Sequence, residues 1–143
     1  MSVRFYSTIT PVTYMLFNGV FQRFPGLKIV TAETDFGWLP FLMQICDDQY
    51  TRYAVWHGSD AKKKPSEYMK EQFYCTFMYD EVGCSMLDYT GDDNIMWSSD
   101  YPHGVTTWPK SRDYIEKNLG ARPQKQREKV LSGNAKRLYG LEG

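Results

Sequence analysis

The sequence predicts an α/β fold with a parallel sheet. Three short apolar runs, at residues 27–33, 72–78 and 94–99, are rich in β-branched or aromatic residues and stop at polar or turn residues. Longer segments with apolar residues at spacings of three and four separate them, which is typical of amphipathic helices. Alternating strands and helices build βα units, and a length of 143 residues suits one domain, so we expect a single domain over residues 1–143.

The amino-terminal part is expected to be a helix followed by the first strand. Thr10 followed by Pro11 is typical of a helix start, with Thr as the cap and Pro at the first helical position. A Pro-Gly pair further on should end this helix. Residues 27–33 then predict a strand covered on both faces, with Glu33 at its carboxyl end.

A second helix and a polar loop come next. The helix should begin near Pro40 and run into the mid-fifties, because apolar or amphipathic residues recur at three and four: Trp38, Phe41, Leu42, Ile45, Cys46, Gln49, Tyr50 and Tyr53. The stretch 57–66 is polar and rich in helix breakers, and it predicts a surface loop. Its three lysines, residues 62–64, fit a solvated turn better than a docking patch, since three charges fall short of a typical basic cluster.

The rest of the chain is expected to complete the alternation of strands and helices. Residues 72–78 and 94–99 are the second and third predicted strands, with a short helix between them. Residues 111–119 and 127–141 predict two closing helices. The last should be interrupted at a Ser-Gly-Asn sequence and should end at Gly140, because glycine favours the left-handed conformation that terminates helices.

Acidic residues follow all three predicted strands. Parallel α/β sheets carry their chemistry at the carboxyl ends of the strands, where Glu33, Asp80 with Glu81, and Asp100 fall. Acidic residues also favour helix starts, and for Asp80 and Glu81 this capping interpretation is the better one. It is weaker for Asp100, because Tyr-Pro-His follows and no helix can begin before that proline.

Composition and charge exclude several classes of partner. The 17 basic and 17 acidic residues balance, so no long-range field would attract nucleic acid or an acidic membrane. Aromatic residues reach 16%, which favours some of them facing a ligand or another chain. The three cysteines are an odd number without close pairing, so we expect buried, inert thiols. Without an 18-residue apolar run or a signal peptide, we expect a soluble, cytoplasmic protein.

Five motifs follow one another along nearly the whole chain. They are Gly-Val-Phe-Gln-Arg-Phe-Pro-Gly-Leu-Lys-Ile-Val-Thr-Ala-Glu (19–33), Gly-Trp-Leu-Pro (37–40), Pro-Ser-Glu-Tyr (65–68), Ser-Asp-Tyr-Pro-His (99–103) and Gly-Asn-Ala-Lys-Arg-Leu-Tyr-Gly-Leu (133–141). Together they resemble the amidohydrolase-2 family, which includes aminocarboxymuconate semialdehyde decarboxylase. The family consists of metal-dependent (β/α)8 barrels, and the resemblance covers their carboxyl-terminal portion, about strands 6–8 with flanking helices.

The resemblance implies roles for specific residues. In the family, the aspartate of Ser-Asp-Tyr-Pro reaches the catalytic metal and handles a proton, and Asp100 occupies that position. A carboxylate suits both tasks, because it can ligate a divalent ion or accept a proton from metal-bound water. Glu33 stands where the sixth strand ends and would ligate metal or bind substrate. His103 would orient the substrate or serve only as a loop residue. Trp38, Tyr101 and Trp108 would line the substrate pocket.

The sequence also departs from the family pattern. Members with an intact site carry a His-x-His pair after the first strand and a histidine after the fifth, whereas this chain has only two histidines, His57 and His103. We interpret His57 as a surface residue. A full barrel takes about 250 residues, so 143 residues correspond to part of one, with open strand edges that another chain would cover.

Two functions therefore remain open. The first is a metal-dependent hydrolase or decarboxylase acting on a small organic acid or on a C–N or C–O bond, with a divalent metal, expected to be zinc. The second is a non-catalytic, truncated domain of the same family that folds by oligomerisation. Both predict a homo-oligomer or a complementing chain as partner, and neither involves nucleic acid or a membrane.

Overall fold

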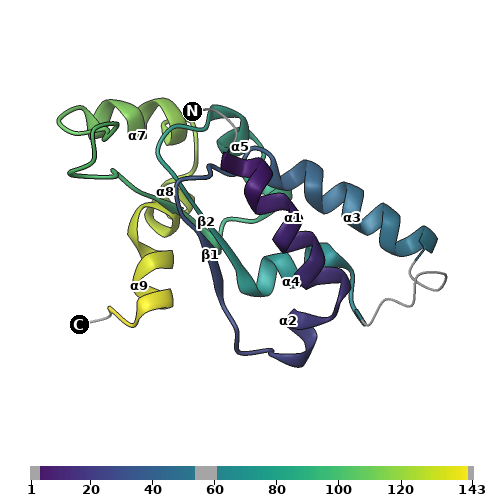
Figure 1. Ribbon diagram of the computed structural model, residues 1–143. Coiled ribbons are helices and arrows are strands. Elements are labelled where there is room, and N and C mark those ends of the chain that lie inside the picture. Colours follow the sequence, from purple (N-terminus) through teal and green to yellow (C-terminus); the bar gives the residue numbers. More distant parts are fainter. Residues whose placement is uncertain (1–3, 54–60, 142–143) are drawn as a thin grey trace.

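A computed structural model describes residues 4–53 and 61–141 (Figure 1). Helices surround a small central sheet whose strands are β1 (Ile29–Thr31), β2 (Phe73–Phe77) and β3 (Ile95–Trp97). The helical segments are α1 (Arg4–Phe17), α2 (Val20–Arg23), α3 (Leu39–Tyr53), α4 (Pro65–Gln72), α5 (Glu81–Ser85), α6 (Leu87–Thr90), α7 (Ser111–Leu119), α8 (Gln124–Glu128), the π-helical turn η1 (Lys129–Gly133) and α9 (Asn134–Tyr139). Within these ranges, no helix is long and apolar enough to cross a membrane.

The sheet is parallel, as the sequence predicts, with the strand order β1-β2-β3. Phe73 pairs with Ile29 on one side, and Cys75 pairs with Ile95 on the other. β2 is therefore the central strand, and four of its five residues are buried. The expectation that the first strand is covered on both faces is met only in part, since all of β1 is half-buried, with Ile29 packed against the core. The reason is its place at an edge of the sheet.

The core lies between the sheet and the helices α1, α3 and α4, which are grouped on one side of the strands in Figure 1. Phe73, Cys75 and Phe77 alternate along β2 and face this core, each at most 1% exposed. From α3, the buried residues are Leu39, Pro40, Leu42, Met43 and Cys46. The predicted helix is confirmed, but Phe41 and Ile45, which the periodicity assigned to its apolar face, are exposed.

The predicted helix start at Thr10 and Pro11 is wrong. The described helix α1 already includes Arg4, so Pro11 lies inside it. An internal proline costs about 3 kcal/mol because it removes one backbone hydrogen bond and crowds the preceding turn. Val12 and Leu16 are almost fully buried, and burial of such side chains contributes about 1.5–3 kcal/mol each, which is enough to offset that cost.

α4 is a helix in a region where the sequence predicts a loop as far as residue 66. Pro65 stands at its first position, and the Glu67 carboxylate accepts the backbone N–H of Lys64 at 2.8 Å. Asp47 of α3 provides a second cap, because its oxygens accept the backbone N–H and the hydroxyl of Ser66 at 2.9 and 2.7 Å. The lysines at 62–64 are exposed, and His57 lies outside the described residues.

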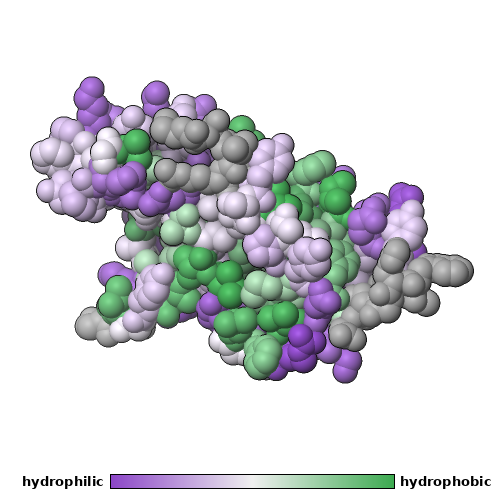
Figure 2. Space-filling model, in the orientation of Figure 1, coloured by the Kyte–Doolittle hydropathy of each residue, from purple (hydrophilic) through white to green (hydrophobic). Residues whose placement is uncertain are grey.

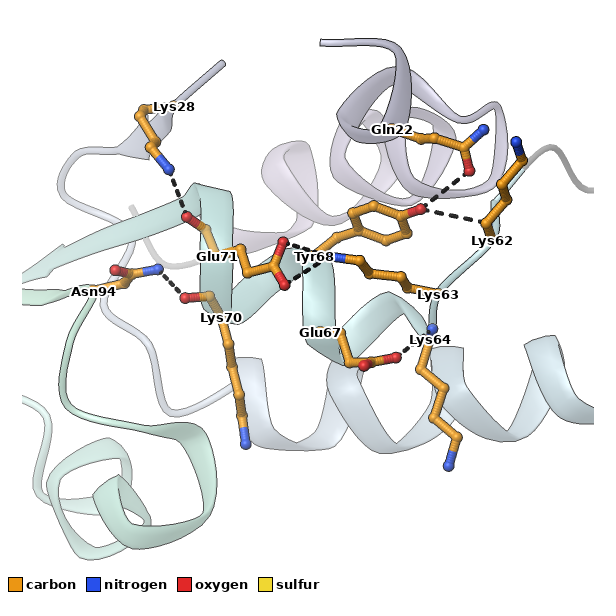
Figure 3. Close-up of polar contacts among 10 residues, drawn as sticks. All are labelled: Gln22, Lys28, Lys62, Lys63, Lys64, Glu67, Tyr68, Lys70, Glu71 and Asn94. Atoms are coloured by element: carbon orange, nitrogen blue, oxygen red, sulfur yellow. Dashed lines mark hydrogen bonds and ion pairs between the residues drawn. The ribbon is translucent and has the colours of Figure 1, made fainter. Parts of the chain in front are cut away.

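The amino-terminal end of the sheet is fastened to α4 (Figure 3). Lys28, just before β1, donates to the carbonyl of Glu71 at 2.7 Å, and Asn94, just before β3, donates to the carbonyl of Lys70 at 2.6 Å. Lys63 adds two bonds to the Glu71 carboxylate at 2.8 and 2.9 Å. These contacts join both outer strands to one helix end, which is a structural role. In parallel α/β folds, chemistry belongs to the opposite end.

The carboxyl-terminal helices follow the prediction closely. α7 has the predicted bounds, and Gly140 ends α9 in the left-handed conformation with φ of 64°. The interruption expected at Ser-Gly-Asn is the π-helical turn η1, which ends at Gly133. Asn134 then donates to the carbonyls of Asp92 and Ile95 at 2.6 and 2.8 Å, so the last helix is anchored to β3.

Candidate functional site

Glu33 and Asp100 lie at the same end of the sheet, beyond the carboxyl ends of β1 and β3. β2 separates these strands, so the backbones of β1 and β3 run about 10 Å apart at the usual interstrand spacing. Both residues have left-handed backbones, with φ of 59° and 56°. This conformation costs a non-glycine residue about 1–2 kcal/mol and is concentrated at functional sites. Asp35, in the same loop as Glu33, shares this conformation with φ of 51°, so the left-handed backbones belong to the loops after β1 and β3, and the roles of Glu33 and Asp100 stay predictions.

Asp100 contacts the histidine that the sequence placed beside it. Oδ2 of Asp100 and Nδ1 of His103 are hydrogen-bonded at 2.9 Å, and the backbone N–H of His103 donates to the carbonyl of Asp100 at 2.8 Å. The Asp100 side chain is 14% exposed, whereas that of His103 is 57% exposed. Oδ1 has no hydrogen bond to any described residue. One carboxylate oxygen is thus held in place, and the other can bind a cation or accept a proton.

The chain after Asp100 folds back on the end of β3. The carbonyl of Ser99 accepts the hydroxyl of Thr106 at 2.7 Å and the N–H of Thr107 at 3.0 Å. Tyr101 and Trp108 are exposed on this loop, and their rings meet at a centroid distance of 5.9 Å. The loop therefore presents an aromatic pair close to Asp100 in the chain.

Trp38 lies in the loop between β1 and α3. Its indole N–H donates to the carbonyls of Thr34 and Asp35 at 3.0 and 3.1 Å. Its ring packs edge to face on the ring of Phe73, the first residue of β2, with a centroid distance of 6.2 Å. Trp38 thus contacts both the loop after β1 and the first residue of β2, and its place in one substrate pocket with Tyr101 and Trp108 stays a prediction.

Glu33 is linked to the central strand rather than to Asp100. Its backbone N–H donates to the hydroxyl of Thr76 at 3.1 Å, which fixes the turn after β1 against β2. The residue itself is half-buried. Nothing in the sequence indicated the Thr76 contact, because it joins positions that are 43 residues apart.

Asp80 has a structural role, which confirms the capping interpretation. Its Oδ1 accepts the N–H of Gly83 at 2.8 Å, so it caps α5. Its Oδ2 accepts the N–H groups of Phe36 and Gly37 at 2.7 and 2.6 Å. One carboxylate therefore joins the loops after β1 and β2, with all its bonds to backbone. Glu81, in the first turn of α5, accepts the hydroxyl of Tyr79 at 2.6 Å.

The described residues provide an incomplete metal site. Across 4–53 and 61–141, no group of three or more His, Cys, Asp or Glu residues is arranged to hold a metal ion. Zinc sites use three or four protein ligands, usually including histidine. Asp100 offers a free carboxylate oxygen and Glu33 stands two strands away, so any resident ion would need ligands from outside these residues.

Comparison with known proteins identifies the family. The amidohydrolase family model matches residues 4–141. A 2-amino-3-carboxymuconate-6-semialdehyde decarboxylase from Dictyostelium discoideum is 25% identical over 145 residues, covering 94% of this chain and 37% of the relative.

Solved structures agree in fold. A 5-carboxyvanillate decarboxylase from Sphingomonas paucimobilis is 27% identical with a TM-score of 0.75, and the match covers 92% of this chain and 39% of that one. A dihydroxybenzoic acid decarboxylase from a Polaromonas species, with bound manganese and the inhibitor 2-nitroresorcinol, is 26% identical with a TM-score of 0.75, over 94% and 40% of the two chains. This chain thus spans about two fifths of the length of these proteins, and by the match over residues 4–141 it belongs to the amidohydrolase family.

Proposed function

We propose that this chain forms the carboxyl-terminal part of a metal-dependent decarboxylase or hydrolase acting on a small organic acid, with Asp100 at the reacting centre. The observation that carries the proposal is the Asp100 carboxylate, which follows β3 in a left-handed backbone and has one oxygen bound to His103. The relatives named above are decarboxylases of aromatic or unsaturated acids, which favours decarboxylation.

The free Oδ1 atom of Asp100 would ligate the ion or take up a proton at the reacting centre. A divalent ion would supply Lewis acidity there, polarising a substrate oxygen or lowering the pKa of a water molecule. Glu33 would bind the ion or the substrate from the other side of β2, and His103 would hold Asp100 or contact the substrate. Tyr101 would contact the substrate from the loop after β3. Trp38 directly precedes α3, so it would contact a substrate that extends toward that helix.

The metal ligands that the described residues lack would come from a partner. We propose that a second copy or a complementing chain pairs with the open edges of the sheet. The backbone groups of Tyr74 face β1, so those of Val30 point away from β2 in the parallel ladder. By the same pattern, the backbone N–H and C=O groups of Trp97 point away from β2, toward the outer edge of β3. Figure 2 shows apolar residues gathered below α1, over α2 and the chain that leads from it into β1, beside the edge where a partner would pair.

Metal content tests the proposed function. The protein is purified without chelators, alone and in any larger assembly it forms, and metals are quantified by elemental mass spectrometry. We expect about one zinc or manganese ion per site, lost in Asp100→Asn, which keeps the shape of the side chain and removes its charge. Asp48→Asn is the matched control, since Asp48 is exposed on α3 and pairs only with Arg52 among the described residues.

Two results would contradict the proposal. One is wild-type protein without metal above background, and the other is Asp100→Asn with undiminished metal. Either would favour the second candidate, a non-catalytic domain that folds by oligomerisation. The observation that favours this candidate is the incomplete set of metal ligands among the described residues. Where metal is bound, release of carbon dioxide from aromatic acids distinguishes a decarboxylase from a hydrolase.

A further inference from the structure

A cleft lies between the loop after β2 and the helix α7. Its volume is about 440 Å³, within the range of small-molecule sites. It is lined by Tyr79, Lys110, Asp113, Tyr114 and Lys117. None of these residues takes part in the proposed Asp100 site.

Two tyrosine rings form the wall of the cleft. Tyr79 and Tyr114 meet edge to face, with a centroid distance of 5.9 Å and an interplanar angle of 89°. They are 44% and 37% exposed, so each presents part of its ring to solvent. Perpendicular rings offer an aromatic ligand one stacking surface and one edge, and such a contact contributes about 0.5–1.5 kcal/mol beyond burial.

The wall is held in place before any ligand arrives. Asn118 of α7 accepts the backbone N–H of Asp80 at 2.6 Å and donates to the carbonyl of Tyr114 at 2.7 Å. The Tyr79 hydroxyl donates to Glu81 at 2.6 Å. Asn118 is buried, so these bonds fix α7 against the loop. A pre-organised wall lowers the entropy cost of binding.

The charges of the lining favour an anion that also has a hydrogen-bond donor. Two lysines, Lys110 and Lys117, and one carboxylate, that of Asp113, line the cleft. Lys117 Nζ lies 5.6 Å from the centroid of the Tyr79 ring, over the aromatic wall. No ion pair to a described residue involves Lys110 or Asp113. A carboxylate ligand would therefore find unneutralised ammonium groups, and a hydroxyl would find an acceptor.

We propose that this cleft binds a small aromatic carboxylate bearing a ring hydroxyl. The ring packs on Tyr114 and Tyr79, the carboxylate lies between Lys110 and Lys117, and the hydroxyl donates to Asp113. The site is separate from Asp100 and does not depend on a metal or on the function proposed above.

Nuclear magnetic resonance titration of the whole chain with 4-hydroxybenzoate tests this. We expect saturable shifts confined to residue 79 and residues 110–117. Lys117→Met and Tyr114→Leu should each weaken binding by roughly fivefold, the equivalent of losing one such contact. Lys136→Met, at an exposed lysine of α9, is the control and should bind as wild type does. Tyr114→Phe keeps the ring and should retain binding, which guards against misfolding of the leucine variant.

Shorter probes separate the parts of the ligand. Benzoate lacks the hydroxyl and phenol lacks the carboxylate, so both should bind more weakly than 4-hydroxybenzoate. Shifts at residues 99–108 in place of the cleft would overturn the assignment, since the ligand would then occupy the Asp100 region. Unchanged affinity in Lys117→Met and Tyr114→Leu, or the lack of saturable shifts in wild type, would overturn it as well.

Discussion

Single carboxylates determine how the loops at the carboxyl end of the sheet are built. Asp100 and Asp80 both follow strands. The carboxylate of Asp80 accepts hydrogen bonds from three backbone N–H groups, whereas one carboxylate oxygen of Asp100 has no hydrogen bond to a described residue. A carboxylate bound only to backbone holds a fold together, and one with a free oxygen can do chemistry. The difference lies in which backbone groups reach each side chain.

Close packing around Asp80 makes Gly83→Ala a test of that structural role. A Cβ atom at residue 83 would lie 2.7 Å from Asp80 Oδ2 and 2.8 Å from the Phe36 ring. Overpacking of this kind costs about 1–3 kcal/mol, which exceeds the helix propensity gained with alanine. We expect a lower free energy of unfolding in urea. Gly26→Ala, where no atom lies within 4 Å, should be nearly neutral, and equal stability of the two variants would refute the argument.

The cysteines are expected to be unreactive in the folded protein. All three are buried, and burial raises the pKa of Cys46 to about 11 and those of Cys75 and Cys84 to about 12. The thiolate is the reactive form, so little of it exists at neutral pH. A colorimetric thiol reagent at pH 8 should label the protein slowly, and should label all three thiols in urea. Rapid labelling of native protein would contradict the buried geometry.

Among the elements, the carboxyl-terminal helices depend on contacts with the loop before β3. Lys129, in η1, donates to Asp92 at 2.8 Å and to Asp93 at 2.7 Å. The hydrogen bond from Lys129 lowers the pKa of Asp93, and the bonds to Asp92 and Asp93 raise the pKa of Lys129. An ion pair of this kind holds η1 against the loop, in addition to the buried Asn134 side chain.

This ion pair gives stability a defined pH dependence. Because the folded pKa of Asp93 is lowered, its contribution is present above the unfolded pKa near 3.9 and is lost as the pH falls through the folded value. The contribution of Lys129 is lost only as the pH rises through its raised pKa. Thermal melts from pH 7 down to 3 should therefore show a smaller acid loss in Lys129→Met than in wild type. Lys125→Met, on α8, should keep the wild-type slope, and parallel curves for all three proteins would refute the linkage.

For the molecule as a whole, the outer edges of β1 and β3, which pair with no other strand of residues 4–53 and 61–141, predict self-association or complementation. Three strands are about two fifths of an eight-stranded barrel, in line with the 37–40% of the relatives that the chain spans. An unpaired edge is a template for pairing with another chain. We expect the wild-type chain to have a mass above the 16.7 kDa of one copy, measured by size exclusion with light scattering.

A substitution at the edge of β1 identifies the contact. Val30→Pro removes an N–H that points away from β2, so it should leave the sheet intact and reduce the assembly to single chains. Val30→Thr keeps the N–H and should preserve the assembly, with circular dichroism confirming that both variants fold. A wild-type mass of one copy would contradict self-association and leave complementation by a different chain. An unchanged assembly in Val30→Pro would show that the contact does not use the edge of β1.

The sequence by itself determined the parallel α/β class, the three strands and the positions of Glu33 and Asp100 at their carboxyl ends. Hydrophobic period and strand composition are local properties, so they can be read along the chain. The motifs also determined the family, which the match over residues 4–141 confirms.

Only the tertiary structure decided the helix through Pro11, the capping of α4 by Asp47, and the bonds of Asp80 to Phe36 and Gly37. Each depends on groups brought together from distant parts of the chain or on burial that offsets a local penalty. The cleft beside α7 has the same origin, because Tyr79 and Tyr114 meet only once Asn118 joins α7 to the loop after β2. Local pattern sets what each segment prefers, and packing free energy decides which side chains meet.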